Sequence, residues 1–133
     1  LRGRKIPSPN GAHVRPTTGM IRESLFQRLG AKCVGARFLD LFAGTGVLGF
    51  EALSRGAAFV LAIEKHRGTA KTLEQTTKQL GIDDSHYQVR CADALQWLKQ
   101  GNSQASFDLV MMDPPYGQVP LPPIIEALSQ YGW

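Results

Sequence analysis

The chain has 133 residues, of which 43% are hydrophobic and 20% are charged, and its formal net charge is +4. This length and composition predict one globular domain with a single core. No apolar run approaches the length of a membrane span, and the basic start lacks the apolar region of a signal peptide. We therefore expect a cytoplasmic protein with no membrane partner.

The positive charge is concentrated at the start of the chain. Residues 1–32 carry seven Lys or Arg and one Glu, a net charge of +6, whereas residues 33–133 have a net charge of −2. We expect residues 1–16, which contain three prolines, to form a basic arm or short hairpin, and residues 17–133 to form the main domain. A basic arm beside a near-neutral domain is typical of nucleic-acid-binding proteins, although a solvated terminus can have the same composition.

Strands and helices are predicted to alternate along the main domain. Thr17 or Thr18 can cap a helix that reaches Gly30, because apolar residues recur there at helical spacing. Strands are expected near 36–41, 58–63, 86–91 and 107–112, and further helices near 47–55, 66–80, 94–100 and 121–130. This order predicts an α/β fold with a mostly parallel sheet and helices on both faces.

The first predicted strand ends in a glycine-rich turn. Asp40 is followed by Gly44, Gly46 and Gly49 in a Gly-x-Gly-x-x-Gly pattern that opens a helix. Such glycines let the backbone approach a ligand, and the helix start supplies free N–H groups. Glu64 ends the second strand, where its carboxylate could accept both hydroxyls of a ribose or could face solvent. The pattern fits dinucleotide-binding folds and other nucleoside-binding α/β domains.

The fourth predicted strand runs into Asp113-Pro114-Pro115-Tyr116. The two prolines fix their own backbone and lack an N–H, which leaves nearby carbonyl groups as acceptors. The Asp113 carboxylate is another acceptor, and the Tyr116 ring offers a flat face for stacking. These features suit a planar base that carries an amine, although an ordinary turn with a solvated Asp would share them.

The segments Asp40–Gly49 and Asp113–Tyr116 resemble motifs I and IV of the S-adenosylmethionine-dependent amino-methyltransferases. The longer run from Asp40 to Ala57, with Arg15-Pro16-Thr17 and Arg22–Phe26, is similar to the RsmD-like family of bacterial 16S ribosomal RNA guanine-N2 methyltransferases. The resemblance implies a Rossmann-like class I methyltransferase fold. A complete sheet of this class has more strands than the four predicted, so we expect the chain to stop after the fourth strand and its helix.

The resemblance also implies roles for individual residues. The cofactor would be S-adenosylmethionine, with Asp40 near its amino end, Glu64 at the ribose and Asp93 at the adenine amine. The whole cofactor-binding set is Asp40, Phe42, Gly44, Gly46, Glu64, Lys65, Asp93 and Ala94. The catalytic set is Asp113, Pro114, Pro115 and Tyr116, and the RNA-binding set is Arg2, Arg4, Lys5, Arg15, Thr17 and Arg22. The implied partner is ribosomal RNA or a small-subunit assembly particle, bound by a monomer.

Three other functions are compatible with parts of this pattern. The turn at 113–116 would equally serve an adenine-N6 methyltransferase acting on DNA or RNA. A nicotinamide oxidoreductase would use the glycine loop and Glu64, but it has no evident use for Asp40 or the Asp-Pro-Pro-Tyr turn. A non-catalytic RNA-binding module would keep the basic arm without needing the cofactor residues.

The remaining chemistry-bearing residues predict no further site. His13, His66 and His86 are scattered, without the spacing typical of metal ligands, so no metal site is predicted. Cys33 and Cys91 are interpreted as reduced core residues.

Overall fold

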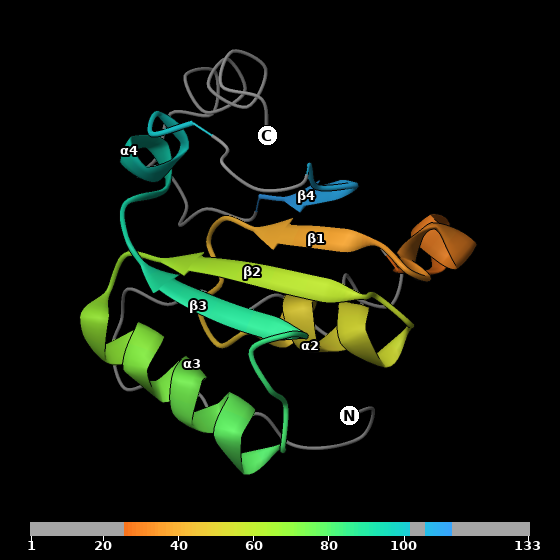
Figure 1. Ribbon diagram of the computed structural model, residues 1–133, viewed down its shortest axis with the longest axis horizontal. Helices are drawn as coiled ribbons and strands as arrows, with labels where there is room; N and C mark the ends of the chain where they lie inside the picture. The colour runs from red at the N-terminus through yellow and green to blue at the C-terminus, as the bar shows by residue number, and fades with distance from the viewer. Residues whose placement is uncertain (1–25, 102–105, 113–133) are drawn as a thin grey trace.

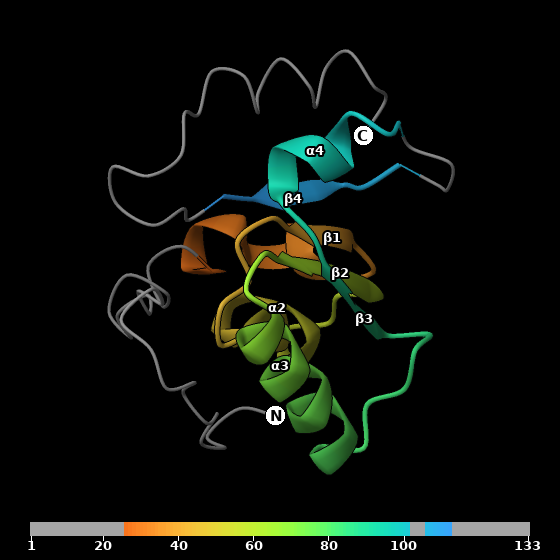
Figure 2. The same cartoon turned by 90° about the vertical axis from the view of Figure 1, so that its left-hand side faces the viewer.

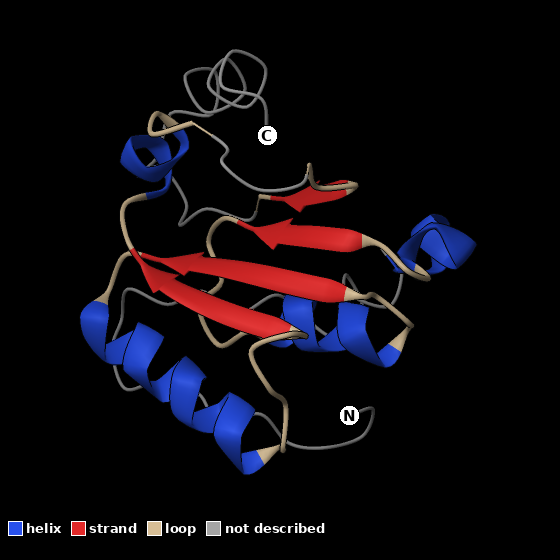
Figure 3. Ribbon diagram, viewed as in Figure 1, coloured by secondary structure: helices blue, strands red, loops and turns tan. Residues whose placement is uncertain are grey.

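The computed structural model describes residues 26–101 and 106–112 (Figure 1). Residues 26–29 are helical and lead into a 3-10 turn, η1, and an alternating series of strands and helices follows (Figure 3). The elements are η1 (Gly30–Cys33), β1 (Arg37–Asp40), α2 (Val47–Ser54), β2 (Phe59–Glu64), α3 (Arg67–Gln79), β3 (Tyr87–Cys91), α4 (Ala94–Leu98) and β4 (Leu109–Met111). The four predicted strands and the three predicted helices between 47 and 100 are thus confirmed. The arm, the start of the first helix and the helix expected near 121–130 lie outside the described residues.

The four strands form one parallel sheet in the order β3-β2-β1-β4. In the register, Phe38 of β1 lies beside Val60 of β2 on one side and Leu109 of β4 on the other. All carboxyl ends therefore meet at one edge of the sheet, where the arrowheads point in Figure 1. The strand order reverses between β1 and β4, and in open α/β sheets ligands bind outside the carboxyl ends at such a switch point.

Helices cover both faces of the sheet, as predicted (Figure 2). Alternate residues of a strand point to opposite faces, so β2 contributes Val60 and Ala62 to one core and Leu61 and Ile63 to the other. The first core lies against α2 and α3, and the second lies against α4. Every residue of β2 is buried, as expected for a strand that is covered on both faces.

Helix α3 is amphipathic although its sequence holds few large apolar residues. Its buried face combines Leu73 with small and hydroxyl-bearing residues. The hydroxyl of Thr76 donates to the Thr72 carbonyl at 2.9 Å, and that of Thr77 donates to the Glu74 carbonyl at 2.7 Å. Because these hydroxyls find partners inside the helix, the threonines are buried without a large desolvation cost.

Strand β4 is fixed beside β1 by a contact at the amino edge of the sheet. The Asp108 carboxylate accepts the N–H of Arg37 at 2.8 Å, and the Arg37 carbonyl accepts the N–H of Asp108 at the same distance. The Arg37 guanidinium lies 5.0 Å from the ring centres of both Phe59 and Phe107. These contacts join the residue before β4 to the first residue of β1.

The two cysteines differ in their environment. Cys33 is buried, whereas Cys91 is exposed at the end of β3, so the interpretation of Cys91 as a core residue was wrong. The physical reason is that β3 is the outermost described strand on its side of the sheet, and its burial decreases towards its carboxyl end. The Cys91 thiol donates to the Lys65 carbonyl at 3.6 Å.

None of the helices in the two described ranges combines the length and the apolar character needed to cross a membrane.

Candidate functional site

The glycine loop after β1 requires glycine for two separate reasons. Gly44 and Gly46 have φ angles of +55° and +83°, in the left-handed region that side chains disfavour. In addition, a Cβ at Gly46 would collide with Cδ1 of Leu73 and lie 2.8 Å from Cε2 of Phe50. The loop is closed by a hydrogen bond of 2.9 Å from the Gly46 N–H to the Ala43 carbonyl. Its backbone is therefore held in one tight turn against α2 and α3.

Helix α2 starts at this turn and packs closely on the sheet. Gly46 provides no side-chain cap, and the first N–H groups of a helix have no partners inside it. The helix start thus offers donors to a ligand at the carboxyl edge. The third glycine, Gly49, allows the close packing, because a Cβ there would lie 2.9 Å from Cγ1 of Val60 and 3.0 Å from Cε2 of Tyr87.

Asp40 lies beneath the glycine loop, in the layer between the sheet and α2. It is the last residue of β1, is 1% exposed, and by strand alternation shares a face with Phe38. Tyr87 lies in the same layer, 2% exposed and stacked on Phe50 with ring centres 4.9 Å apart. Burial, and then the charge of Asp40, hold the pKa of Tyr87 well above its usual range. Asp40 is therefore part of a buried polar layer under the loop.

Glu64 joins the loop to the start of α3. Its side chain is on the same face as Asp40, and the residue is 7% exposed. One carboxylate oxygen, Oε1, accepts the Gly44 N–H at 2.9 Å, and the other, Oε2, accepts the His66 N–H at 2.8 Å. Each oxygen has a second lone pair that could accept a ligand hydroxyl. The structure thus places two of the sequence-predicted site residues, Gly44 and Glu64, in direct contact.

The third strand brings Asp93 and Ala94 to the same edge. β3 ends at Cys91, so Asp93 does not close the strand but caps α4, where its Oδ2 accepts the Gln96 N–H at 3.1 Å. Its other carboxylate oxygen is not needed for this cap. Ala94 is the buried first residue of α4. Of the other two candidates, Lys65 is exposed and Phe42 packs against the core below α4.

Sequence reasoning missed two residues that shape this edge. His66 was set aside as one of three scattered histidines, yet its N–H is one of the two donors that hold Glu64. Its position at the start of the helix predicted near 66–80 was the available signal. Tyr87 gave no comparable signal, because its contact with Gly49 depends on how α2 packs on the sheet.

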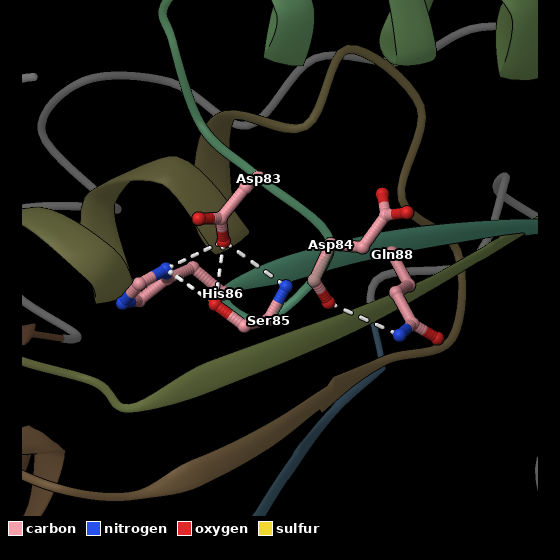
Figure 4. Close-up of polar contacts among 5 residues, drawn as sticks. All are labelled: Asp83, Asp84, Ser85, His86 and Gln88. Carbon is pink, nitrogen blue, oxygen red and sulfur yellow. Dashed lines mark hydrogen bonds and ion pairs between the residues drawn. The ribbon is translucent and has the colours of Figure 1, made fainter.

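A second polar cluster lies at the opposite edge of the sheet, in the loop before β3 (Figure 4). The Asp83 carboxylate accepts from the Ser85 hydroxyl at 2.5 Å and contacts Nδ1 of His86 at 2.9 Å, and the hydroxyl lies 3.1 Å from the same Nδ1. In a catalytic relay the Asp and the Ser bind different ring nitrogens. Here both bind Nδ1, so this cluster stabilises a turn and has no relay geometry.

No three His, Cys, Asp or Glu side chains gather into a metal-binding group within residues 26–101 and 106–112. Among the described residues, the candidate site consists of backbone donors and carboxylate acceptors along the carboxyl edge, which suits a nucleoside that carries hydroxyl and amine groups. Asp113, Pro114, Pro115 and Tyr116, and the candidates Arg2, Arg4, Lys5, Arg15, Thr17 and Arg22, lie outside the described residues.

Comparison with known proteins shows the family to which the chain belongs. The family described as "Conserved hypothetical protein 95" matches residues 1–133. The ribosomal RNA small subunit methyltransferase D of Buchnera aphidicola is 40% identical over the whole chain, which covers 68% of that relative. The protein of the same name from Escherichia coli K12 is 38% identical over 99% of the chain, which covers 65% of that relative. The chain thus spans about two thirds of the length of these relatives.

Solved structures share the fold. The structure titled "Putative methyltransferase yhhF from Escherichia coli" superposes with a TM-score of 0.86 at 38% identity, covering 99% of this chain and 70% of that one. A Thermus thermophilus hypothetical protein, TTHA0928, superposes with a TM-score of 0.80 at 29% identity, covering 98% of this chain and 74% of that one. The Rossmann-like methyltransferase fold expected from the motifs is confirmed. The chain belongs to the family described as Conserved hypothetical protein 95, the RsmD family, as its motifs predicted.

Proposed function

We propose that this chain carries the cofactor-binding part of an enzyme that transfers a methyl group from S-adenosylmethionine to the exocyclic N2 amine of a guanine in 16S ribosomal RNA. The observation that carries the proposal is the contact between Glu64 and Gly44, which joins a buried strand-end carboxylate to the glycine loop at the switch point of the sheet. The names of the family relatives supply the substrate class.

The residues along the carboxyl edge fit this cofactor. Glu64 would accept the ribose hydroxyls with the lone pairs that the Gly44 and His66 N–H groups leave unused. The turn at Gly44 and Gly46 would bring the backbone against the methionine portion, with Asp40 as the acidic group near its ammonium. Asp93 would accept from the adenine amine beside the Ala94 backbone, with Phe42 and Lys65 flanking. When bound, the cofactor supplies a methyl group already activated on sulfur.

The residues that follow β4 would hold the target amine. An aryl amine is a poor nucleophile because its lone pair is delocalised into the ring. The Asp113 carboxylate and the Pro114 carbonyl would each accept one amine hydrogen, which localises the lone pair towards the methyl group. Pro115 would fix the turn, and Tyr116 would stack on the base, a contact worth roughly 1–3 kcal/mol. The enzyme's main contribution is therefore alignment of nitrogen and methyl carbon.

The basic arm would hold the RNA. We assign Arg2, Arg4 and Lys5 to phosphates, and Arg15, Thr17 and Arg22 to the region near the target base. A paired base has to be flipped out, or already unpaired, before it can enter the pocket. We further propose a cytoplasmic monomer that acts on ribosomal RNA or on a small-subunit assembly particle.

An adenine-N6 methyltransferase is the second candidate, because the turn at 113–116 would hold either amine. The test is to incubate a full-length form of the protein and S-adenosylmethionine with unmethylated 16S ribosomal RNA and to identify modified nucleosides by mass spectrometry. N2-methylguanosine is the expected product, and N6-methyladenosine would replace the proposal with its alternative. Calorimetry should detect binding of S-adenosylhomocysteine but not of NAD. The reverse result would favour an oxidoreductase.

A further inference from the structure

The outward face of α3 carries a row of three cations. Arg67, Lys71 and Lys78 are exposed, and their spacing of four and seven residues places them within about 40° of one another around the helix axis. The buried residues of α3 lie on the opposite side of the helix. The only acidic residue on this face of α3 is Glu74, so the face has a net charge of +2. We call Arg67, Lys71 and Lys78 the α3 row.

The α3 row differs from the arginines that support the fold. Arg37 lies against two aromatic rings, and Arg55 forms an ion pair with Glu51 at 2.8 Å. Across the described ranges, by contrast, no hydrogen bond or ion pair holds any member of the α3 row, even though Glu74 is only three or four residues from Lys71 and Lys78. These three charges therefore form no hydrogen bond or ion pair that would stabilise the described part of the domain.

The row also begins where a cation is unfavourable. Arg67 is the first residue of α3, the helix has no acidic residue in its first turn, and exposed Lys65 precedes it. The positive end of a helix dipole repels such charges. This end of α3 lies at the carboxyl edge of the sheet, three residues after Glu64 and the candidate cofactor site. A row of cations that starts beside the site and gains nothing from the domain itself fits a polyanionic substrate.

We propose that the α3 row binds the phosphate backbone of the RNA that flanks the target base. This inference rests on the proposed function, because it extends the RNA surface of that same enzyme from the basic arm to α3. The row spans about 16 Å along the helix, a length over which one nucleic-acid strand presents several phosphates. Contacts to phosphates carry no sequence information, so the row positions the RNA and does not select the base.

The test compares three forms of the full-length protein: wild type, Arg67→Gln/Lys71→Gln/Lys78→Gln, and a control, Arg28→Gln/Lys32→Gln/Lys99→Gln. The control removes the same charge from exposed positions outside α3. Glutamine has nearly the helix propensity of Lys and Arg, so both variants should fold. The affinity of each form for a 16S ribosomal RNA fragment is measured across a salt series, together with S-adenosylmethionine affinity and thermal unfolding.

We expect the α3 variant to bind RNA more weakly at low salt, with a log–log salt slope flatter by about two to three units, while the control changes by less than about one unit. Cofactor affinity and thermal unfolding should stay at wild-type values. An unchanged slope in the α3 variant, or an equal loss in the control, would overturn the inference. If the wild type binds RNA with the α3-dependent slope yet makes no methylated nucleoside, the proposed function fails and the RNA surface stands. If the wild type methylates RNA and the salt slope does not depend on the α3 row, the proposed function stands and the inference about the α3 row fails.

Discussion

The Glu64 carboxylate and the Gly44 N–H are joined by a hydrogen bond of 2.9 Å across 20 residues of sequence. The second carboxylate oxygen accepts the His66 N–H at 2.8 Å, so one buried side chain connects the end of β2, the glycine loop and the start of α3. Glu64 therefore has a role in shaping the loop that is separate from any contact with a ligand. Experiments on this residue have to distinguish the two roles.

Glu64→Gln affects both roles, and a stability measurement and an affinity measurement report on them individually. The amide keeps one acceptor oxygen but turns an NH₂ group towards one of the two backbone donors, so we expect the free energy of unfolding to fall by about 1–3 kcal/mol. S-adenosylmethionine affinity should fall more than tenfold, about 1.4 kcal/mol, as measured by calorimetry. The control is Glu51→Gln, which removes the ion pair with Arg55 on α2 and should leave cofactor affinity unchanged. Wild-type affinity in Glu64→Gln would contradict the ribose assignment.

Gly46→Ala tests the close packing of the loop. A methyl group there meets Leu73 and Phe50 and also adopts a φ of +83°, so both overpacking and backbone strain are expected. Gly81→Ala is the matched control, because its φ is +72° with no atom within 4 Å of the added Cβ. In urea unfolding, Gly46→Ala should lose about 1–3 kcal/mol more than Gly81→Ala, and only Gly46→Ala should weaken cofactor binding. Equal losses would mean that the contacts relax without cost.

The layout of the sheet could be predicted from the sequence because local patterns determine it. Apolar runs, the glycine turn at 44–49 and the alternation of elements each report on a few neighbouring residues. The same patterns placed Asp40, Glu64 and Asp93 near the ends of consecutive strands, and the structure brings all three to one edge. The sequence does not distinguish a carboxylate near a strand end from one that caps the following helix, and Asp93 caps α4.

The features that could not be predicted from the sequence depend on packing between elements that are distant along the chain. Tyr87 is buried because Gly49 lets α2 approach the sheet, and neither residue indicates the other in the sequence. Cys91 was predicted to be buried from its residue type, but it ends an outer strand and is exposed. The bond from His66 to Glu64 involves a backbone N–H, which carries no side-chain signature.

Asp113→Asn tests the proposed contact with the target amine. The variant loses the charge that would accept an amine hydrogen in the transition state, so methylation should fall roughly 100-fold or more, with cofactor affinity within a few-fold of wild type. Asp108→Asn is the control, since that carboxylate binds the Arg37 N–H before β4 begins. It should lower stability and keep turnover. Single-turnover methylation together with calorimetry distinguishes these outcomes. If Asp113→Asn keeps most of its activity, the Asp113 carboxylate has no role in methyl transfer.

Tyr87→Phe tests the buried polar layer. Among the described residues the Tyr87 hydroxyl is buried without a hydrogen-bond partner. Burial, and then Asp40, hold the pKa of Tyr87 well above its usual range in the folded state, so the folded protein keeps its proton where the unfolded chain loses it. The wild type should therefore lose stability as the pH rises above about 10, the ordinary Tyr pKa, and Tyr87→Phe should lose less. If the free energies of unfolding of the two forms fall equally as the pH rises to 11, Tyr87 does not have the raised pKa described here.

Asp83 provides the opposite pH dependence at the other edge of the sheet. Hydrogen bonds from the Ser85 hydroxyl, and then from His86, lower the pKa of Asp83 from 3.8 to about 2 in the folded protein. The folded state therefore binds this proton less readily than the unfolded chain. The resulting stabilisation is fully present above the unfolded pKa of 3.8 and is lost as the pH falls through about 2.

Asp83→Asn isolates this contribution, because the amide cannot titrate. Urea unfolding at pH 6, 4 and 3 should show the wild type more stable than Asp83→Asn at pH 6, with a difference that shrinks as the pH falls. Asp84→Asn is the matched control, since Asp84 accepts from Gln88 only through its backbone carbonyl (Figure 4). The difference in free energy of unfolding between the wild type and Asp84→Asn should not shrink in this way as the pH falls. A difference between wild type and Asp83→Asn that stays constant from pH 6 to pH 3 would show that the Ser85 and His86 contacts do not distinguish the charged carboxylate from its neutral form.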